Sequence, residues 1–270
     1  MSSGSLRIQE VGSFVVRPLI AGNWKMNGLQ DALTNIKKIA ETTLAIADSV
    51  DTVVFPPATL LERAAFIARA SHLKIGGQDC SSEIHGAFTG ELSAEMLSDA
   101  GATFALVGHS ERRQRHSETD DTVRQKAIRA LTAGLRPVIC IGESADQKNA
   151  GQTLEVLSHQ IMQVVPRTAD FGVMVIAYEP LWAIGTGLRP EDVEIAKAHT
   201  HIRQELASQW GEKGQQIPIL YGGSVNLENA QAILRLPNVN GLLIGGASLD
   251  AAQFSAICVG ASANLAAGKL

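Results

Sequence analysis

This chain has few aromatic residues, a small net charge and little clustering of basic residues, and each of these features limits the class of protein to which it can belong. Only 4% of the 270 residues are Phe, Trp or Tyr, so a core must be built largely from Ala, Val, Leu and Ile. The formal net charge is −4, and the one short basic group consists of Arg112, Arg113 and Arg115. A group of that length is more typical of a solvated helix face than of a nucleic-acid interface. We therefore expect no nucleic-acid partner.

Cysteine is rare as well, and no long apolar run occurs. Cys80, Cys140 and Cys258 are odd in number and form no C-x-x-C pair, which argues against a disulfide scaffold or a zinc site and favours a reducing compartment. No apolar run approaches the roughly 18 residues of a membrane span. The apolar patch near the N-terminus is too short and interrupted for a signal peptide. We interpret residues 1–17 as an N-terminal extension or an added remnant, and expect a cytoplasmic protein that does not enter a membrane.

Eight short apolar runs are present, and most are followed by a stretch with helical period. The runs are unbroken rather than alternating and rich in Val, Ile and Leu, which is typical of parallel strands buried on both faces. They cover residues 18–23, 52–55, 73–78, 103–108, 137–142, 173–178, 217–223 and 240–246. Helices are predicted within residues 29–50, 118–134, 190–211 and 226–237, from apolar stripes, acidic starts and terminal Gly or Pro.

Eight strands that alternate with helices predict either an open doubly wound sheet or a closed barrel. Eight units in roughly 250 residues match the usual size of the barrel, and no linker-like stretch divides the chain. The phosphate-binding pattern G-x-G-x-x-G does not follow the first run, which argues against a dinucleotide-binding sheet. We therefore predict the α/β class, with one closed (β/α)8 TIM barrel as the catalytic domain over residues 18–270.

Residues with useful chemistry follow five of the predicted strands. Taken singly, each has an ordinary explanation, such as a solvated charge, a capping histidine or a glycine turn. Barrel enzymes, however, gather their chemistry at the carboxyl ends of the strands, so the shared position favours a single site on that rim. The residues are Asn23 and Lys25 after the first run, His109, Ser110 and Glu111 after the fourth, Glu179 after the sixth, Gly222, Gly223 and Ser224 after the seventh, and Gly245 and Gly246 after the eighth.

Seven motifs occur in a fixed order, namely GNWKMNG, GAFTGE, VGHSERR, CIGE, AYEPLWAIGTG, YGGSV and GGASL. Through them the chain resembles the triosephosphate isomerase family over roughly residues 18–267, and GHSERR together with YEPLWAIGTG is highly specific. The resemblance implies an intramolecular aldose–ketose isomerase of glycolysis and gluconeogenesis. Such an enzyme interconverts dihydroxyacetone phosphate and D-glyceraldehyde 3-phosphate by proton transfer through a cis-enediolate. No cofactor and no metal are expected.

The resemblance also implies a role for each matching residue. Glu179 is the base, strengthened by burial, while Asn23, Lys25 and a neutral His109 stabilise the oxyanion. Glu111 is the fifth catalytic residue, with a supporting or proton-relay role. A short helix after Gly246 is expected to point its N-terminus at the phosphate. The predicted substrate and phosphate contacts are Asn23, Lys25, Gly185, Gly223, Ser224, Gly245 and Gly246. The predicted lid consists of Pro180, Leu181, Trp182, Ala183, Ile184, Gly185 and Thr186, with Leu181, Trp182 and Ile184 covering the carboxylate.

A homodimer is implied in the same way, with residues 81–91 inserted into the other subunit and Thr89 close to the partner subunit's Asn23. One position departs from the family pattern, because Asn240 stands where the family often has Asp paired to an arginine. With Arg203 as that arginine, we expect a neutral hydrogen bond in place of an ion pair.

Two alternatives to this reading remain. Another phosphate-binding barrel enzyme, such as a lyase or a sugar-phosphate epimerase, would share the glycine loops but has no reason to carry Lys25, His109 and Glu179 on one rim. A non-catalytic barrel that serves as a binding protein would need none of these groups.

Overall fold

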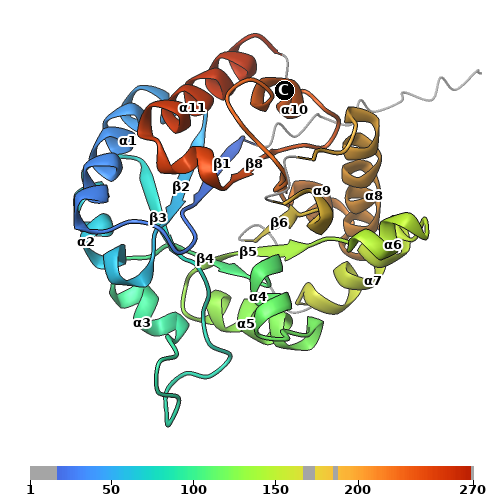
Figure 1. Cartoon of the computed structure of the whole chain (residues 1–270), viewed down its shortest axis with the longest axis horizontal. Helices are drawn as coiled ribbons and strands as arrows, with labels where there is room; N and C mark the ends of the chain where they lie inside the picture. Colours follow the sequence, from blue (N-terminus) through green and yellow to red (C-terminus); the bar gives the residue numbers. More distant parts are fainter. Residues whose placement is uncertain (1–16, 167–173, 185–187, 269–270) are drawn as a thin grey trace, which may run out of the picture.

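The computed structural model describes residues 17–166, 174–184 and 188–268, and it confirms the predicted closed barrel. Eight parallel strands pair in sequential order, β8 pairs with β1, and helices surround them (Figure 1). The strands are β1 (Leu19–Asn23), β2 (Asp51–Phe55), β3 (Leu73–Gly77), β4 (Phe104–Val107), β5 (Arg136–Ile141), β6 (Val175–Tyr178), β7 (Ile219–Tyr221) and β8 (Gly241–Ile244). Of the predicted extension, only Arg17 lies within the described residues.

The described helices include the four that the sequence predicts, each somewhat shorter than the predicted range. The α-helices are α1 (Leu33–Ile46), α2 (Ala58–Ala68), α3 (Ala94–Asp99), α4 (Ser110–Arg115), α5 (Asp120–Thr132), α6 (Ala145–Asn149), α7 (Thr153–Val164), α8 (Asp192–Trp210), α9 (Glu212–Gln216), α10 (Ala230–Leu234) and α11 (Ala251–Ala266). Short 3-10 turns are η1 (Gln30–Ala32), η3 (Leu181–Ala183) and η4 (Gly246–Leu249). No helix in this part of the chain is long and apolar enough to cross a membrane.

A short helix is present where the sequence predicts one, the 3-10 helix η4 that begins at Gly246, but it ends at Leu249 and does not extend over all of the predicted residues 247–254. The chain first makes the 3-10 turn η4, and α11 begins separately at Ala251. The cause is Asp250, whose carboxylate accepts hydrogen bonds from the backbone N–H groups of Ala252 and Gln253 and so starts a new helix. The element that follows Gly246 is therefore a single tight turn.

The core has two layers, which explains why the strands read as unbroken apolar runs. One cluster fills the barrel interior, and a larger one lies between the strands and the helices. At Gly76 an added Cβ would lie 2.4 Å from a ring carbon of Phe55, so the glycine makes room for that aromatic side chain. The interior cluster consists of Leu19, Ala21, Val53, Phe55, Phe104, Leu106, Val138, Cys140, Val175, Ala177, Leu220 and Leu243.

The segments that follow six of the strands matter for function. Because all strands are parallel, the residues that follow β1, β4, β6, β7 and β8 emerge at one rim of the barrel. The connection from β3 to α3, residues 78–93, instead projects away from the ring of helices (Figure 1). Ile84, Phe88 and Thr89 on this projecting loop are exposed.

The predicted neutral pairing of Arg203 with Asn240 is confirmed. The Arg203 guanidinium is 7% exposed and donates to the Asn240 side-chain oxygen at 2.8 Å and to the Gly214 carbonyl at 2.6 Å. The same Asn240 oxygen accepts the backbone N–H of Ile219 at 3.1 Å, which ties it to β7. Burial lowers the pKa of Arg203 to about 10. The guanidinium is thus a buried charge whose described partners are neutral.

We predict that Asn240→Asp stabilises the protein at neutral pH. A hydrogen bond to a charged partner contributes about 1 kcal/mol more than a neutral one, which corresponds to a rise in Tm of about 2–4 °C. Asn240→Ala is the matched control, and it should lower Tm because the guanidinium and the Ile219 N–H both lose their acceptor. Differential scanning calorimetry measures both variants. A lower Tm for Asn240→Asp would show that the cost of burying the carboxylate exceeds its gain from Arg203.

Candidate active site

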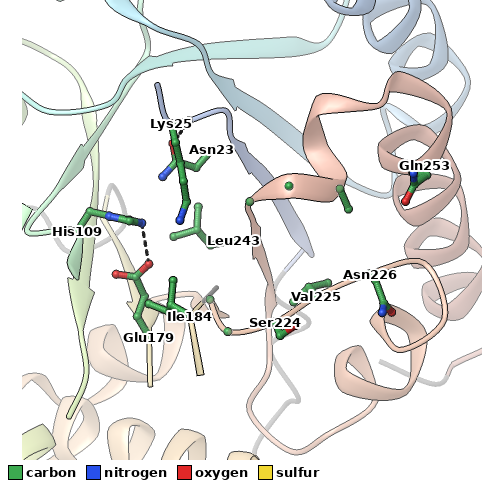
Figure 2. Close-up of a pocket in the computed structure, with 15 residues that line it drawn as sticks. Asn23, Lys25, His109, Glu179, Ile184, Ser224, Val225, Asn226, Leu243 and Gln253 are labelled. Carbon is green, nitrogen blue, oxygen red and sulfur yellow. Dashed lines mark hydrogen bonds and ion pairs between the residues drawn. The ribbon is translucent and has the colours of Figure 1, made fainter. Parts of the chain in front are cut away.

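A cavity of about 440 Å³ opens at the carboxyl rim of the barrel, and most of the predicted site residues line it (Figure 2). It receives side chains or backbone from the ends of β1, β4, β6, β7 and β8, so it exists only because the barrel closes. The predicted residues that line it are Asn23, Lys25, His109, Glu179, Ile184, Gly223, Ser224, Gly245 and Gly246. Gly185 and Thr186 lie outside the described residues.

Glu179 and His109 both line this cavity, are in contact with one another, and are buried. His109 Nε2 lies 3.1 Å from Glu179 Oε1, the contact drawn as a dashed line in Figure 2. The other carboxylate oxygen accepts the backbone N–H of Ser110 at 3.2 Å. The Cys140 thiol, on the barrel-interior side, also helps to lower the pKa of this carboxylate. Polar contacts therefore hold Glu179 in place despite its exposure of only 2%.

The charges of this pair depend on their contact. Burial raises the pKa of Glu179, but His109 and the Ser110 N–H outweigh burial and keep that pKa below its usual value. Burial lowers the pKa of His109, and the facing carboxylate outweighs it and raises that pKa. The expectation that burial strengthens Glu179 as a base is therefore not the net effect in this arrangement, because the carboxylate rests against a hydrogen-bond donor.

The other nitrogen of His109 favours a neutral ring. Nδ1 accepts the backbone N–H of Glu111 at 3.2 Å, at the first turn of α4. That hydrogen bond needs a lone pair on Nδ1, so the proton of a neutral imidazole lies on Nε2. Once the Glu179 carboxylate moves away, burial, the Glu111 N–H and the Lys25 charge oppose a second proton. The Glu111 carboxylate, 3.8 Å from Nδ1, favours it, but burial is the largest of these influences. The neutral donor predicted from the sequence is thus the form that these contacts favour when the pair is separated.

Lys25 reaches the cavity from an unusual backbone conformation. Its φ is +53°, in the left-handed region that costs a non-glycine residue about 1–3 kcal/mol. Two hydrogen bonds hold it there: its N–H donates to Asn23 Oδ1 at 2.9 Å, and its carbonyl accepts from Gln78 Nε2 at 2.8 Å. The ammonium lies 2.7 Å from Glu111 Oε1. Glu111 does not line the cavity and contacts the site through Lys25 and His109.

The glycines at the ends of β7 and β8 leave space for a ligand. An added Cβ would meet no atom within 4 Å at Gly246 and only the Lys25 Cε, at 3.5 Å, at Gly245. Packing within the described residues therefore does not require glycine at these two positions, and the free space adjoins the cavity. At Gly222 a Cβ would lie 2.9 Å from Glu179 Cγ, so this glycine makes room for the carboxylate side chain itself.

The predicted lid is described up to Ile184, and its residues divide between two sides. Ile184 lines the cavity beside Glu179 (Figure 2). Trp182 does not, because its indole N–H donates to Glu143 Oε1 at 2.8 Å on the other side of the turn. Neither does Leu181, whose backbone N–H donates to the Glu143 carbonyl at 3.0 Å. The expectation that all three apolar residues cover the carboxylate therefore holds only for Ile184 in this arrangement.

Several lining or supporting residues were missed by the sequence reasoning. Gly222 was part of the strand-end pattern and could have been included. Gln78 and Cys140 carry no signal of their own, since one acts through the Lys25 backbone and the other belongs to an apolar strand. The further lining residues are Val225, Asn226, Leu243, Ala247 and Gln253. Among the described residues, no group of three or more His, Cys, Asp or Glu is arranged to hold a metal ion.

Comparisons with known proteins agree with this geometry. A family model described as triosephosphate isomerase matches residues 18–261. A protein of that name from Rhizobium etli is 51% identical over 90% of this chain and 95% of its own length. One from Ruegeria pomeroyi is 52% identical over 89% of this chain and 96% of its own. A crystal structure of triosephosphate isomerase from Bartonella henselae is similar with a TM-score of 0.85 and 40% identity, over 91% of this chain and 99% of that one.

We predict that His109→Gln raises the pKa of Glu179. The substitution removes the partner that lowers this pKa and leaves the carboxyl buried, so the carboxylate should take up its proton at a higher pH than in the parent chain. Carbon NMR of labelled glutamate side chains, with Glu179→Gln to assign the signal, measures the titration. His201→Gln is the matched control, because His201 contacts Ser158 outside the cavity. An unchanged or lower Glu179 pKa in His109→Gln would contradict the account of this pair.

Proposed function

The chain belongs to the triosephosphate isomerase family, and we propose that Glu179, His109, Asn23 and Lys25 carry out the reaction of that family in it. The chain is accordingly an isomerase that interconverts dihydroxyacetone phosphate and D-glyceraldehyde 3-phosphate. The observation that carries the assignment of residues is the meeting of a buried carboxylate, an imidazole and an ammonium in one cavity beside two glycine loops.

Glu179 is the proposed base. At 3.1 Å from His109 there is no room for a substrate atom between the two groups, so the carboxylate leaves the imidazole when substrate binds. It then loses the donor that lowers its pKa, while burial continues to raise that pKa, and it becomes a stronger base. Glu179 takes a proton from the carbon beside the carbonyl, and the electron pair moves onto the carbonyl oxygen to give the cis-enediolate. The same carboxyl group returns a proton to the neighbouring carbon, while the hydroxyl proton passes from one enediolate oxygen to the other, so that the new carbonyl forms on the carbon that first lost its proton.

His109, Asn23 and Lys25 are the proposed stabilisers of the developing negative charge. The imidazole Nε2–H, the Asn23 amide and the Lys25 ammonium all reach the cavity, and the ion pair with Glu111 holds the ammonium before substrate arrives. Donors that are already in place stabilise a transition state without reorganisation. Glu111 is a positioning residue in this scheme, because its carboxylate holds Lys25 and its N–H holds His109.

The phosphate group is proposed to lie at the ends of β7 and β8. Backbone N–H groups of Gly223, Ser224, Gly245 and Gly246 adjoin the free part of the cavity, and the absence of side chains at the glycines permits close approach. Lys25 supplies a positive charge nearby. The alternative of another phosphate-binding barrel enzyme, a lyase or an epimerase, is not favoured, since the family match and the named relatives point to one activity.

We predict that Glu179→Gln lowers kcat by a factor of about 10²–10⁴, the usual contribution of a general base. The amide has nearly the same shape, so binding of the transition-state mimic phosphoglycolate should survive within a few-fold. A coupled isomerase assay and calorimetric titration measure the two quantities. Glu228→Gln, at an exposed acid outside the cavity, is the control and should behave as the parent chain. Near-parental turnover by Glu179→Gln would remove this residue from the mechanism.

A homodimer formed through the projecting loop is also proposed. Residues 78–93 extend from the barrel, and Ile84 and Phe88 expose 45% and 46% of their surface. Burying apolar side chains of a projecting loop in a partner subunit is favourable in free energy relative to leaving them exposed to water. From the family resemblance we propose that Thr89 of this loop lies close to the partner subunit's Asn23.

The cytoplasm is the proposed location, on the strength of the cysteines. Cys80, Cys140 and Cys258 are all free and buried. Burial raises the pKa of the Cys80 and Cys258 thiols to about 12, so both stay protonated at neutral pH. Unpaired thiols of this kind fit a reducing compartment.

If the dimer forms through the projecting loop, Thr89→Arg should yield monomers of low activity, because a long charged side chain would have to be buried in the partner. Light scattering gives the mass, and the coupled assay gives the activity of the same sample. Thr132→Arg introduces the same change at the exposed end of α5 and should leave a dimer. An unchanged mass for Thr89→Arg would refute this interface.

A further inference from the structure

A second cavity, of about 280 Å³, lies behind the turn that presents Ile184 to the active site. It is separate from the active-site cavity and is lined in part by Glu143, Lys148, Trp182 and Glu194. These residues come from the end of β5, from α6, from η3 and from α8. The cavity leaves free volume beside Trp182, so contacts rather than close packing must fix the position of the indole on this side.

Two side chains hold the indole of Trp182 at its edge and on its face. The ring N–H donates to Glu143 Oε1 at 2.8 Å, and Tyr178 donates its hydroxyl to the same oxygen at 3.3 Å. The Lys148 ammonium lies over the ring, with Nζ 3.4 Å from the ring centroid. An ammonium stacked on an indole is held by electrostatic attraction to the face of the ring. Trp182 is thus fixed in two directions at right angles.

Lys148 is itself held in place at its backbone and at its ammonium group. Its helix α6 begins with a capping box between Ser144 and Gln147. The capping box fixes the first turn of the helix, and Lys148 comes directly after Gln147. Its ammonium also lies 3.3 Å from Glu194 Oε1, on the first turn of α8. The other oxygen of Glu194 accepts the backbone N–H of Glu191 at 2.9 Å, so this carboxylate is fixed as well. Lys148 therefore connects α6, Trp182 and α8.

We propose that Lys148 is a positioning residue for the isomerisation: by holding Trp182 it keeps the turn Leu181–Ala183 in place and Ile184 against the reacting carboxylate. This inference rests on the proposed function. Ile184 lines the active-site cavity two residues after Trp182, so a shift of the indole into the free volume behind it would draw Ile184 away. The enediolate would then be exposed to water and held less firmly in the cavity.

A loosely held enediolate has a second outcome, which provides a specific measurement. Its negative oxygen collapses to an aldehyde, the double bond shifts, and the carbon–oxygen bond to phosphate breaks with the electron pair leaving on phosphate. The resulting enol takes up a proton on its terminal carbon and becomes methylglyoxal. The products are methylglyoxal and inorganic phosphate, with no oxidant or reductant. The ratio of phosphate released to triose phosphate isomerised therefore reports how firmly the turn is held.

The test compares Lys148→Met, Lys148→Arg and Lys197→Met in the full chain, with dihydroxyacetone phosphate as substrate. Lys148→Met keeps the apolar stem and loses the ammonium, and it should raise the phosphate-to-isomerisation ratio by on the order of tenfold, in line with the strength of a stacked ammonium–indole contact. Lys148→Arg keeps a cation over the ring and should restore a ratio near that of the parent chain. Lys197→Met removes another lysine that lines the same cavity and should leave the ratio unchanged.

Glu194→Gln is the second route to the same answer if Lys148→Met folds poorly. Glutamine can still complete the capping box of α8, but it releases Lys148 from its ion pair, so a smaller rise in the ratio is expected. An unchanged ratio in both Lys148→Met and Glu194→Gln would overturn the inference while leaving the isomerase assignment intact. Absence of isomerisation by the parent chain would instead overturn the proposed function.

Discussion

The pairing of β8 with β1 is the constraint on which the rest of the molecule depends. Residues of β1 and β8 lie side by side from Leu19 and Gly241 to Gly22 and Ile244, and this register closes the sheet. Closure leaves a parallel sheet without edges and turns every carboxyl end toward one rim. Lys25, which follows β1, and Gly245, which follows β8, are thereby neighbours despite some 220 intervening positions, with Lys25 Cε 3.5 Å from the position of an added Cβ on that glycine.

At that rim, the site keeps its charged groups in a resting arrangement that substrate must break. Glu179 and His109 satisfy one another, and Lys25 is paired with Glu111. Each contact offsets the cost of holding a charge in a partly dry cavity. In the proposed mechanism, substrate binding replaces the Glu179–His109 contact with contacts to the reacting molecule. In this mechanism the carboxylate then becomes more basic because it loses a donor, and the separated imidazole favours its neutral form because burial lowers its pKa and Nδ1 still accepts a backbone N–H.

The positions of several residues in and around the site also depend on contacts with side chains that lie outside the cavity. Gln78 at the end of β3 holds the carbonyl of Lys25, and Lys148 on α6 holds the indole of Trp182. Neither residue lines the active-site cavity. On α8, which follows the lid, the buried Arg203 relies on neutral acceptors and so links α8 to β7 less strongly than an ion pair would. Position, rather than reactivity, is what these three residues contribute.

The sequence by itself determined the eight strands and the closed barrel, and it supplied the proposed reacting groups. Unbroken Val-, Ile- and Leu-rich runs reveal strands buried on both faces, and the motif order places Glu179, His109 and Lys25 after known strands. What required tertiary structure was the direction of side chains and the balance of charges. The net pKa of Glu179 depends on a 3.1 Å contact with a residue 70 positions away. Trp182 faces Glu143 rather than the cavity, and Asp250 divides one expected helix into a turn and α11. Local pattern cannot decide such features, because each depends on which distant group lies within a few ångströms after the barrel has closed.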